Sequence, residues 1–329
     1  MPLAGRPALV KVLSVYVIAV LTAICYPRTT YAQSVLEILK EAAGSKLSEA
    51  LRIYGTDDRA VVTDTTQFPY SAIGQIQALF GPAAGYEIRL GTGVLISNKV
   101  VLTCAHVVYE TGPGWADNIV FIPGKKGDAE PYGRIKVVGM SGQNGYLQDR
   151  NDEYDIALLL LETAVGQQTG YMSAVFKPTS FFTDRSFNLT GYPYDITDSD
   201  LMYNAVGQSQ RIEGNLIVHY IDGGTGQSGG PLWYETVPTK QYIVVGIYTG
   251  DIDETINGQL TGQFGVAIHI NETFCNWIDQ FIDENDPGSN AGCSSDGGEV
   301  APPACGSGAP GGMMVALLTL GAIRGRRYL

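Results

Sequence analysis

Three histidines are the only imidazoles among the 329 residues: His106, His219 and His269. A serine hydroxyl is a weak nucleophile until a neighbouring base takes its proton, and histidine is the usual base. One serine, Ser228, lies in the glycine-rich stretch DGGTGQSGGPLW (222–233). Glycine loses more conformational freedom on folding than any other residue, so this cluster indicates unusual dihedrals or a close approach. His219 and His269 lie inside expected strands and are predicted to be structural, which leaves His106 as the candidate base.

His106 follows the apolar run VVLTC, and Asp155 begins the run DIALLLLE. Both residues therefore lie at the ends of expected strands, where a rigid scaffold can hold a functional side chain. In such a set Ser228 is the nucleophile, His106 the general base, and Asp155 the group that orients the imidazole and stabilises its charged form. The backbone N–H groups of Gly226 and Ser228 would form an oxyanion hole.

The chain from about residue 58 to residue 270 has the pattern of a β protein. GTGVLISNKVVLT (91–103) predicts a hairpin, and residues 166–180 are expected to cross between two β halves. Many short strands with turn signals favour an all-β barrel or sandwich. In 271–285 apolar residues recur at helical spacing behind Asn271, a suitable N-cap, so one closing helix is expected. Further strands are predicted in NIVFI, RIKVVGM, DIALLLLE, LIVHYI, QYIVVGIYTG and GQFGVAIHI.

The motifs TCAHVV, DIALL and GQSGGPL, in this order, resemble those of the trypsin-like (chymotrypsin-fold) serine proteases. The resemblance covers residues 59–284, and GTDDRAVVTDTTQFPYSAIGQI (55–76) is similar to the start of the bacterial glutamyl endopeptidase-like branch. It implies a secreted serine endopeptidase that cleaves protein or peptide substrates through an acyl-enzyme at Ser228, with no cofactor and no metal. The fold it implies is all-β, with two six-stranded antiparallel β-barrels and a C-terminal helix. The implied domain covers 53–286, divided into barrel one (59–165), barrel two (175–270) and the helix (271–285).

The resemblance also implies four substrate-binding positions. Gly223 and Tyr248 occupy the positions that hold a substrate carboxylate in the glutamyl branch, and neither carries a positive charge. Asp222 corresponds to the acidic pocket floor of trypsin, which would favour Lys or Arg, but glutamyl relatives carry Asp there as well. Tyr248 and Gly250 could instead frame an apolar or mixed pocket, so the residue preference at the cleaved bond is left open.

Activation is expected to differ from that of trypsin. There a freed N-terminal ammonium pairs with an acidic residue just before the nucleophile, and that residue here is Gln227. Cleavage at Arg52–Ile53 would still remove a short pro-segment (33–52), which is a hypothesis resting on sequence position and one basic residue.

Both ends of the chain are expected to be targeting segments. Residues 1–32 combine Arg6 and Lys11, an apolar run and a small-residue site, which is typical of a secretory signal peptide; the alternative is an N-terminal anchor. Residues 287–304 have the composition of a flexible linker. The tail 305–329 contains Cys305, an apolar run and three arginines, and resembles bacterial tripartite sorting tails that engage the membrane or sorting machinery; the alternative is a plain single-pass anchor.

The charge of the body limits the choice of partner. Six of the 21 Lys and Arg residues lie in 1–32 and 313–329, whereas none of the 33 Asp and Glu residues do. An acidic body argues against nucleic acid or anionic lipid as a partner.

Three cysteines remain between the two ends. Export permits disulfides, but three cysteines do not determine a connectivity. A Cys275–Cys293 pair is one hypothesis, with Cys104 as a small buried hydrophobe.

Two alternatives to the protease hypothesis use the same residues. GQSGG also fits the G-x-S-x-G elbow of α/β-hydrolases, in which Ser228, Asp251 or Asp253, and His269 would form an esterase triad. That elbow must open a helix, whereas Pro231 and a strand-like segment follow here. The second alternative is an inactive protease fold that serves as a surface binding module.

Overall fold

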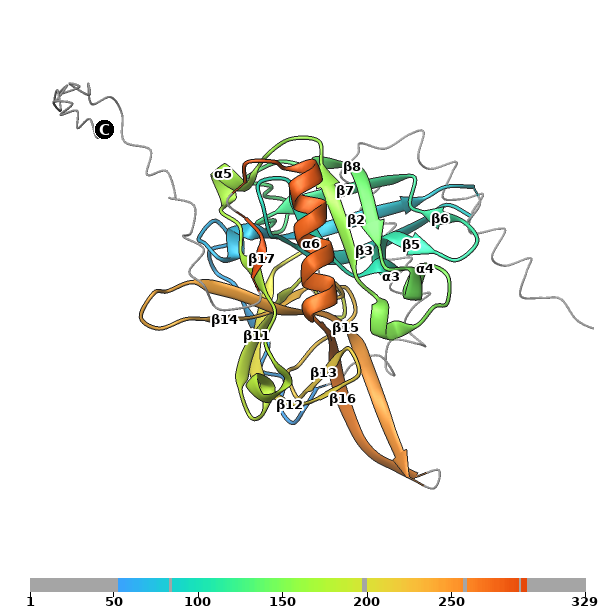
Figure 1. Cartoon of the computed structure of the whole chain (residues 1–329), viewed down its shortest axis with the longest axis vertical. Helices are drawn as coiled ribbons and strands as arrows, with labels where there is room; N and C mark the ends of the chain where they lie inside the picture. The colour runs from blue at the N-terminus through green and yellow to red at the C-terminus, as the bar shows by residue number, and fades with distance from the viewer. Residues whose placement is uncertain (1–52, 83–84, 197–199, 257–258, 290, 295–329) are drawn as a thin grey trace, which may run out of the picture.

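The computed structural model shows two β-barrels side by side, with one helix lying across them (Figure 1). The fold is therefore all-β with a C-terminal helix, as predicted. The residues that the structure describes are 53–82, 85–196, 200–256, 259–289 and 291–294. The expected signal peptide (1–32), pro-segment (33–52) and sorting tail (305–329) lie outside them. No helix within the described ranges is long and apolar enough to span a membrane.

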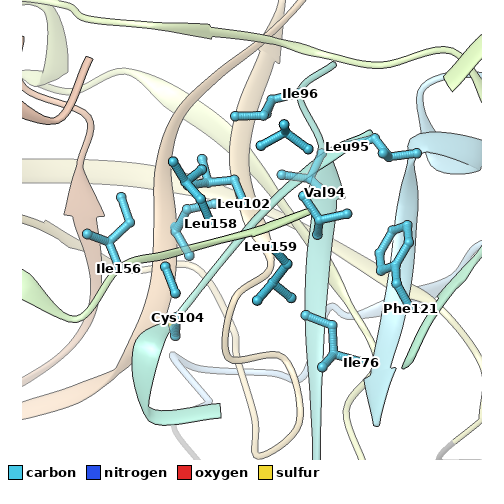
Figure 2. Close-up of a cluster of buried hydrophobic side chains, with 14 of the residues drawn as sticks. Ile76, Val94, Leu95, Ile96, Leu102, Cys104, Phe121, Ile156, Leu158 and Leu159 are labelled. Atoms are coloured by element: carbon cyan, nitrogen blue, oxygen red, sulfur yellow. The ribbon is translucent and has the colours of Figure 1, made fainter. Parts of the chain in front are cut away.

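The first barrel is a closed ring of six antiparallel strands. Apolar side chains from these strands fill its interior, and Figure 2 shows Ile76, Val94, Leu102, Phe121 and Leu159 among them. Side chains alternate across a strand, so each strand contributes every second residue to the barrel interior. In ring order the strands are β2 (Ile73–Phe80), β3 (Glu87–Leu95), β4 (Val100–Thr103), β9 (Ala157–Leu161), β8 (Ile135–Gly142) and β7 (Asn118–Pro123).

The second barrel closes because β14 pairs with both β15 and β11. Its two longest neighbours, β15 and β16, form a hairpin that extends well beyond the barrel (Figure 1). In ring order the strands are β11 (Ser186–Gly191), β12 (Tyr203–Glu213), β13 (Leu216–His219), β16 (Gln259–His269), β15 (Tyr242–Ile256) and β14 (Pro231–Glu235).

Short elements complete the two barrels. The short strand β10, in the predicted crossing, pairs in parallel with β15 and β17, and β1 pairs with β12. The remaining strands are β1 (Ala60–Val61), β5 (Tyr109–Glu110), β6 (Gly114–Trp115), β10 (Ser173–Val175) and β17 (Cys293–Ser294). The short helices are η2 (Tyr70–Ala72), α3 (Ala105–Val108), α4 (Asn144–Leu147), η4 (Asp152–Tyr154), α5 (Gly166–Thr169) and η5 (Thr179–Phe182).

The closing helix α6 (Glu272–Asn285) begins where its cap was expected. The Asn271 side chain accepts a hydrogen bond from the Phe274 N–H at 2.9 Å, which satisfies a free donor of the first turn. The apolar face of α6 packs against barrel one, and the Trp277 indole donates to Ser141 Oγ on β8 at 3.1 Å. The helix thus connects the last strand of barrel two back to barrel one.

The residues after the helix correct one expectation. The linker was expected to be flexible from residue 287, but Cys293–Ser294 form β17 beside β10. A disulfide joins Cys293 to Cys275 in α6, so the hypothesised pairing is present in the structure. The third cysteine, Cys104, is a free and buried thiol.

Candidate active site

Barrel one brings His106 and Asp155 together through the pairing of two strands. β4 and β9 are antiparallel, with Thr103 opposite Ala157. The end of one antiparallel strand lies beside the start of its partner, so the residues just after β4 and just before β9 meet. His106 comes after β4 in the short helix α3, and Asp155 precedes β9.

The His106–Asp155 contact has two hydrogen bonds. The His106 ring Nδ1 lies 2.5 Å from Asp155 Oδ2, and the His106 backbone N–H donates to Asp155 Oδ1 at 2.8 Å. The Asp155 side chain is 6% exposed, whereas the His106 ring is 33% exposed. The carboxylate is therefore fixed inside the barrel, while the imidazole reaches the surface with Nε2 as its remaining nitrogen.

Ser228 lies in the loop before β14, and this loop is attached to barrel one by Thr92 of β3. The Thr92 N–H donates to the Ser228 carbonyl at 2.8 Å, and Thr92 Oγ1 donates to the Gly226 carbonyl at 2.9 Å. The same Oγ1 accepts the Tyr192 N–H at 3.0 Å. Thr92 is completely buried. No sequence motif pointed to Thr92, because an isolated threonine in a strand carries none.

Gly229 places the loop that contains Ser228 against the strand that leads to His106. Its φ is +85°, and a Cβ there would collide with the Thr92 carbonyl, Thr103 Oγ1 and the backbone at Cys104. Glycine is the residue that tolerates both the left-handed backbone and this approach. This is a direct contact between the two barrels. Ser228 comes one residue before Gly229, and His106 comes two residues after Cys104.

Three of the four expected substrate-binding residues also gather here. A Cβ on Gly223 would lie 2.6 Å from the Tyr248 hydroxyl, and that hydroxyl donates to Asp251 Oδ1 at 3.1 Å. Burial, with a further contribution from Asp251, raises the pKa of Tyr248 well above its ordinary value, so the phenol stays neutral. Gly250 has a φ of +155° and open space where a side chain would be.

Asp222 is not an open pocket floor. Its side chain accepts the Tyr54 N–H at 2.6 Å on one oxygen and the Asp58 N–H at 3.0 Å on the other, and the residue is 3% exposed. The segment that starts the described chain therefore covers this carboxylate. Nothing in the sequence connected residues 54–58 to Asp222, which is more than 160 positions away.

The other two histidines lie on strands of barrel two, and the centroid of the His219 ring is 5.9 Å from that of Tyr248. His219 Nδ1 accepts the Ile221 N–H at 3.1 Å, and burial lowers the pKa of His219 to about 3. His269 Nε2 lies 2.9 Å from the Lys177 carbonyl, so its ring is held by backbone. The α/β-hydrolase alternative has no scaffold in this all-β fold, because Ser228 leads into β14 and not into a helix.

Cys104, His106 and Asp155 place possible metal-ligand atoms within 4.8 Å of one another. The donor set does not suit a metal. Burial raises the pKa of the Cys104 thiol well above its ordinary value, and the thiol lies 3.0 Å from the Tyr248 carbonyl as its donor. His106 Nδ1 and Asp155 are already hydrogen-bonded to each other. A thiol must also lose its proton before it can ligate a metal.

The comparisons with known proteins agree with this fold. Residues 91–237 match the family described as the trypsin-like peptidase domain. The chain is 27% identical over 232 residues to an extracellular metalloprotease of Bacillus subtilis, a match that covers 69% of this chain and 70% of that protein. It is 29% identical over 185 residues to a glutamyl endopeptidase of Bacillus licheniformis, covering 56% of this chain and 55% of the relative, so that match spans about half of its length.

Solved structures share the architecture. A Glu endopeptidase in complex with MPD superimposes with a TM-score of 0.57 at 24% identity, covering 70% of this chain and 98% of the other. The protease Anisep from Arthrobacter nicotinovorans gives 0.50 at 16% identity, covering 64% and 93%. The chain therefore has the chymotrypsin-type two-barrel fold, and residues 91–237 are similar to the trypsin-like peptidase domain.

Proposed function

We propose that the chain is a trypsin-like serine endopeptidase that cleaves proteins or peptides, and that Ser228, His106 and Asp155 form its catalytic triad. The observation that carries the proposal is the pair of hydrogen bonds from His106 to Asp155, made beside the Ser228 loop. Asp155 engages Nδ1, so the imidazole presents Nε2 as the atom that takes the Ser228 proton. Ser228 Oγ then bonds to the scissile carbonyl carbon, and the carbonyl oxygen becomes an oxyanion.

The N–H groups of Gly226 and Ser228 are the proposed oxyanion donors. Among the described residues, neither group has a hydrogen-bond acceptor in the protein, although both lie in a largely buried loop. A backbone N–H without an acceptor in the protein is satisfied by water or by a ligand, so both groups are free to bind the oxyanion of the substrate. When the tetrahedral intermediate collapses, His106 returns the proton to the leaving amine, and the acyl-enzyme at Ser228 is hydrolysed by water through the same steps.

Labelling with a fluorophosphonate probe tests the triad. The processed wild-type protein should label at Ser228, the Ser228→Ala and His106→Ala variants should not, and Ser186→Ala, at an exposed serine, should label as wild type. Peptide mass spectrometry identifies the modified serine. If the wild type fails to label in every processed form, the inactive binding-module alternative is correct.

A metal is not part of the proposed reaction. The thiol of Cys104 is protonated, and His106 and Asp155 are hydrogen-bonded to each other. Dialysis against EDTA should therefore leave the phosphonylation rate of the labelled serine unchanged. Loss of labelling that zinc restores would contradict this assignment.

We also propose export and processing. The Cys275–Cys293 disulfide suits an oxidising compartment, and the Bacillus subtilis relative is named as extracellular. Residues 1–32 would be the signal peptide, and 305–329 the tail that holds the protein at the membrane or is removed by sorting machinery.

Cleavage at Arg52–Ile53 would remove 33–52 and retain the docking of Tyr54 and Asp58 on Asp222. Terminal sequencing of the active form tests the assignment, and full activity of a form starting at Gln33 would overturn the pro-segment.

A further inference from the structure

The loop before Ser228 contains a tight turn, Gly224 to Gln227. The Gln227 N–H donates to the Gly224 carbonyl at 3.0 Å, and Gly226, the third residue of the turn, has a φ of +94°. A positive φ at the third position is the signature of a type II turn. In such a turn the central peptide, between Thr225 and Gly226, decides where the Gly226 N–H points.

A hydrogen bond from outside the loop fixes the orientation of this peptide. The Tyr194 N–H donates to the Thr225 carbonyl at 2.8 Å. The C=O and N–H of a trans peptide point in opposite directions, so the Gly226 N–H points away from Tyr194. A rotation of the peptide would break the bond to Tyr194 and turn the proposed oxyanion donor away from its position.

Asp195, the next residue, is held by a buried ion pair with Arg59. Arg59 Nη1 lies 2.8 Å from Asp195 Oδ2, and the two side chains are 3% and 1% exposed. Burial raises the pKa of Asp195, whereas Arg59 favours the charged carboxylate. A buried carboxylate without such a partner would be strongly unfavourable, so Arg59 is what permits Asp195 to occupy this place.

The ion pair also touches the turn directly. A Cβ on Gly224, the first residue of the turn, would collide with Asp195 Oδ1 and Arg59 Nη1. Arg59 is in turn oriented by Asp57, which accepts its Nε–H at 3.0 Å and its Nη2–H at 2.8 Å. The backbone around it is anchored where the Asp58 N–H meets Asp222. The N-terminal segment thus supports the far side of the loop that carries Ser228.

We infer that Arg59 is a positioning residue for the oxyanion hole: it holds Asp195 and Tyr194 so that the Tyr194 N–H sets the Thr225–Gly226 peptide. The inference rests on the proposed function, because the direction of the Gly226 N–H matters only if Ser228 is the nucleophile. It assigns a role in the reaction to a residue 169 positions before Ser228, whose side chain is paired with Asp57 and Asp195.

The test compares Arg59→Met with wild type on a peptide substrate, with kcat expressed per serine that labels with the fluorophosphonate. Loss of one oxyanion donor costs about 10²–10³ in rate, so kcat should fall about 100-fold while KM changes little. A peptidyl trifluoromethyl ketone, whose adduct with Ser228 carries an oxyanion, should bind about 100-fold more weakly.

Two further variants separate positioning from general support. Asp195→Asn keeps the shape and removes the charge pair, and it should shift kcat and inhibitor affinity in the same direction as Arg59→Met. Arg59→Lys keeps a cation and should recover part of kcat. Arg134→Met is the matched control, because Arg134 pairs with Glu130 on the surface and is half exposed.

The outcomes are distinguishable from those of the proposed function. If wild type does not label, the triad proposal fails. If wild type labels and the Arg59 and Asp195 variants only melt earlier, with unchanged kcat per labelled site and unchanged ketone affinity, Arg59 is merely structural and the inference is overturned. If Arg59→Met does not fold, kcat per labelled site and ketone affinity are measured on Asp195→Asn or Arg59→Lys, and these two measurements decide.

Discussion

The two barrels position their parts of the proposed active site by different means. Barrel one holds His106 through two hydrogen bonds to Asp155, one from the ring and one from the backbone N–H. Barrel two places Ser228 by backbone, through glycine dihedrals and hydrogen bonds to Thr92 and Tyr194. The position of His106 depends on few residues that lie close together. The position of Ser228 depends on contacts from several segments that are far apart in the sequence. Damage to barrel one should therefore act on chemistry, and damage to the loop of barrel two should act on folding and chemistry together.

The largest expected effect is that of Asp155→Asn. The variant keeps the shape of the side chain but no longer holds the imidazole in the required tautomer, so kcat should fall by about 10⁴. Thermal unfolding should change far less than activity. Steady-state kinetics and a melting curve on the same preparation check this, and a kcat within tenfold of wild type would show that Asp155 does not orient the base.

Gly229→Ala should act on folding. Its Cβ would enter the space of the Thr92 carbonyl and Thr103 Oγ1 at a φ of +85°, so we expect a loss of about 4 kcal/mol in the free energy of unfolding. The control is Gly127→Ala, where φ is +58° and no atom lies within 4 Å; it should lose only about 1 kcal/mol. Urea denaturation measures both, and equal losses would refute the close approach.

The burial of His219 should make the stability of the protein depend on pH. Burial lowers the pKa of His219 to about 3, so the unfolded chain binds a proton at higher pH than the folded one does. This contribution is fully present above about pH 6.5 and is lost as pH falls from there towards 3. Between pH 6.5 and 5 the loss should be about 2 kcal/mol.

Urea unfolding at several pH values checks this contribution. The His219→Leu variant should show a flatter dependence over the same range. An unchanged slope in the variant would assign the pH dependence to other groups.

The smallest expected effect concerns the residue before the cleaved bond. Asp251 accepts the Tyr248 hydroxyl, which lies beside Gly223, and Arg59, a cation that contacts this loop, is paired with Asp57 and Asp195. We expect peptides with Lys or Arg at this position to be cleaved about tenfold better than matched peptides with Glu. Fluorogenic peptides that differ only there measure the ratio, and a preference for Glu would place the chain with its glutamyl relative.

The sequence predicted the parts of the fold and site that depend on local pattern. The hairpin at 91–103, the helix behind Asn271 and the short apolar strands all carry their own periodicity. The strands β2, β11 and β12 were missed, because their polar residues, as in IGQIQALF and YNAVGQSQRIE, hide the alternation. Packing against neighbouring strands, not their own composition, makes them strands.

The same limit applies within the site. Motifs identified His106, Asp155 and Ser228 as candidates, because each lies in a short recognisable stretch. Thr92 and Arg59 act through contacts with residues more than 130 positions away. Such long-range contacts leave no local signal in one sequence, and only the assembled barrels reveal them.

The disulfide near the end of the described chain has a mechanical consequence. Cys293 is covalently tied to the first turn of α6, and β17 lies in parallel beside β10. If the residues beyond 294 tether the enzyme to a surface, a pulling force enters the body at this cross-link. The load would pass into α6 and into β10, and it would reach β14, the strand that follows Ser228, through the pairing of β10 with β15 and of β15 with β14.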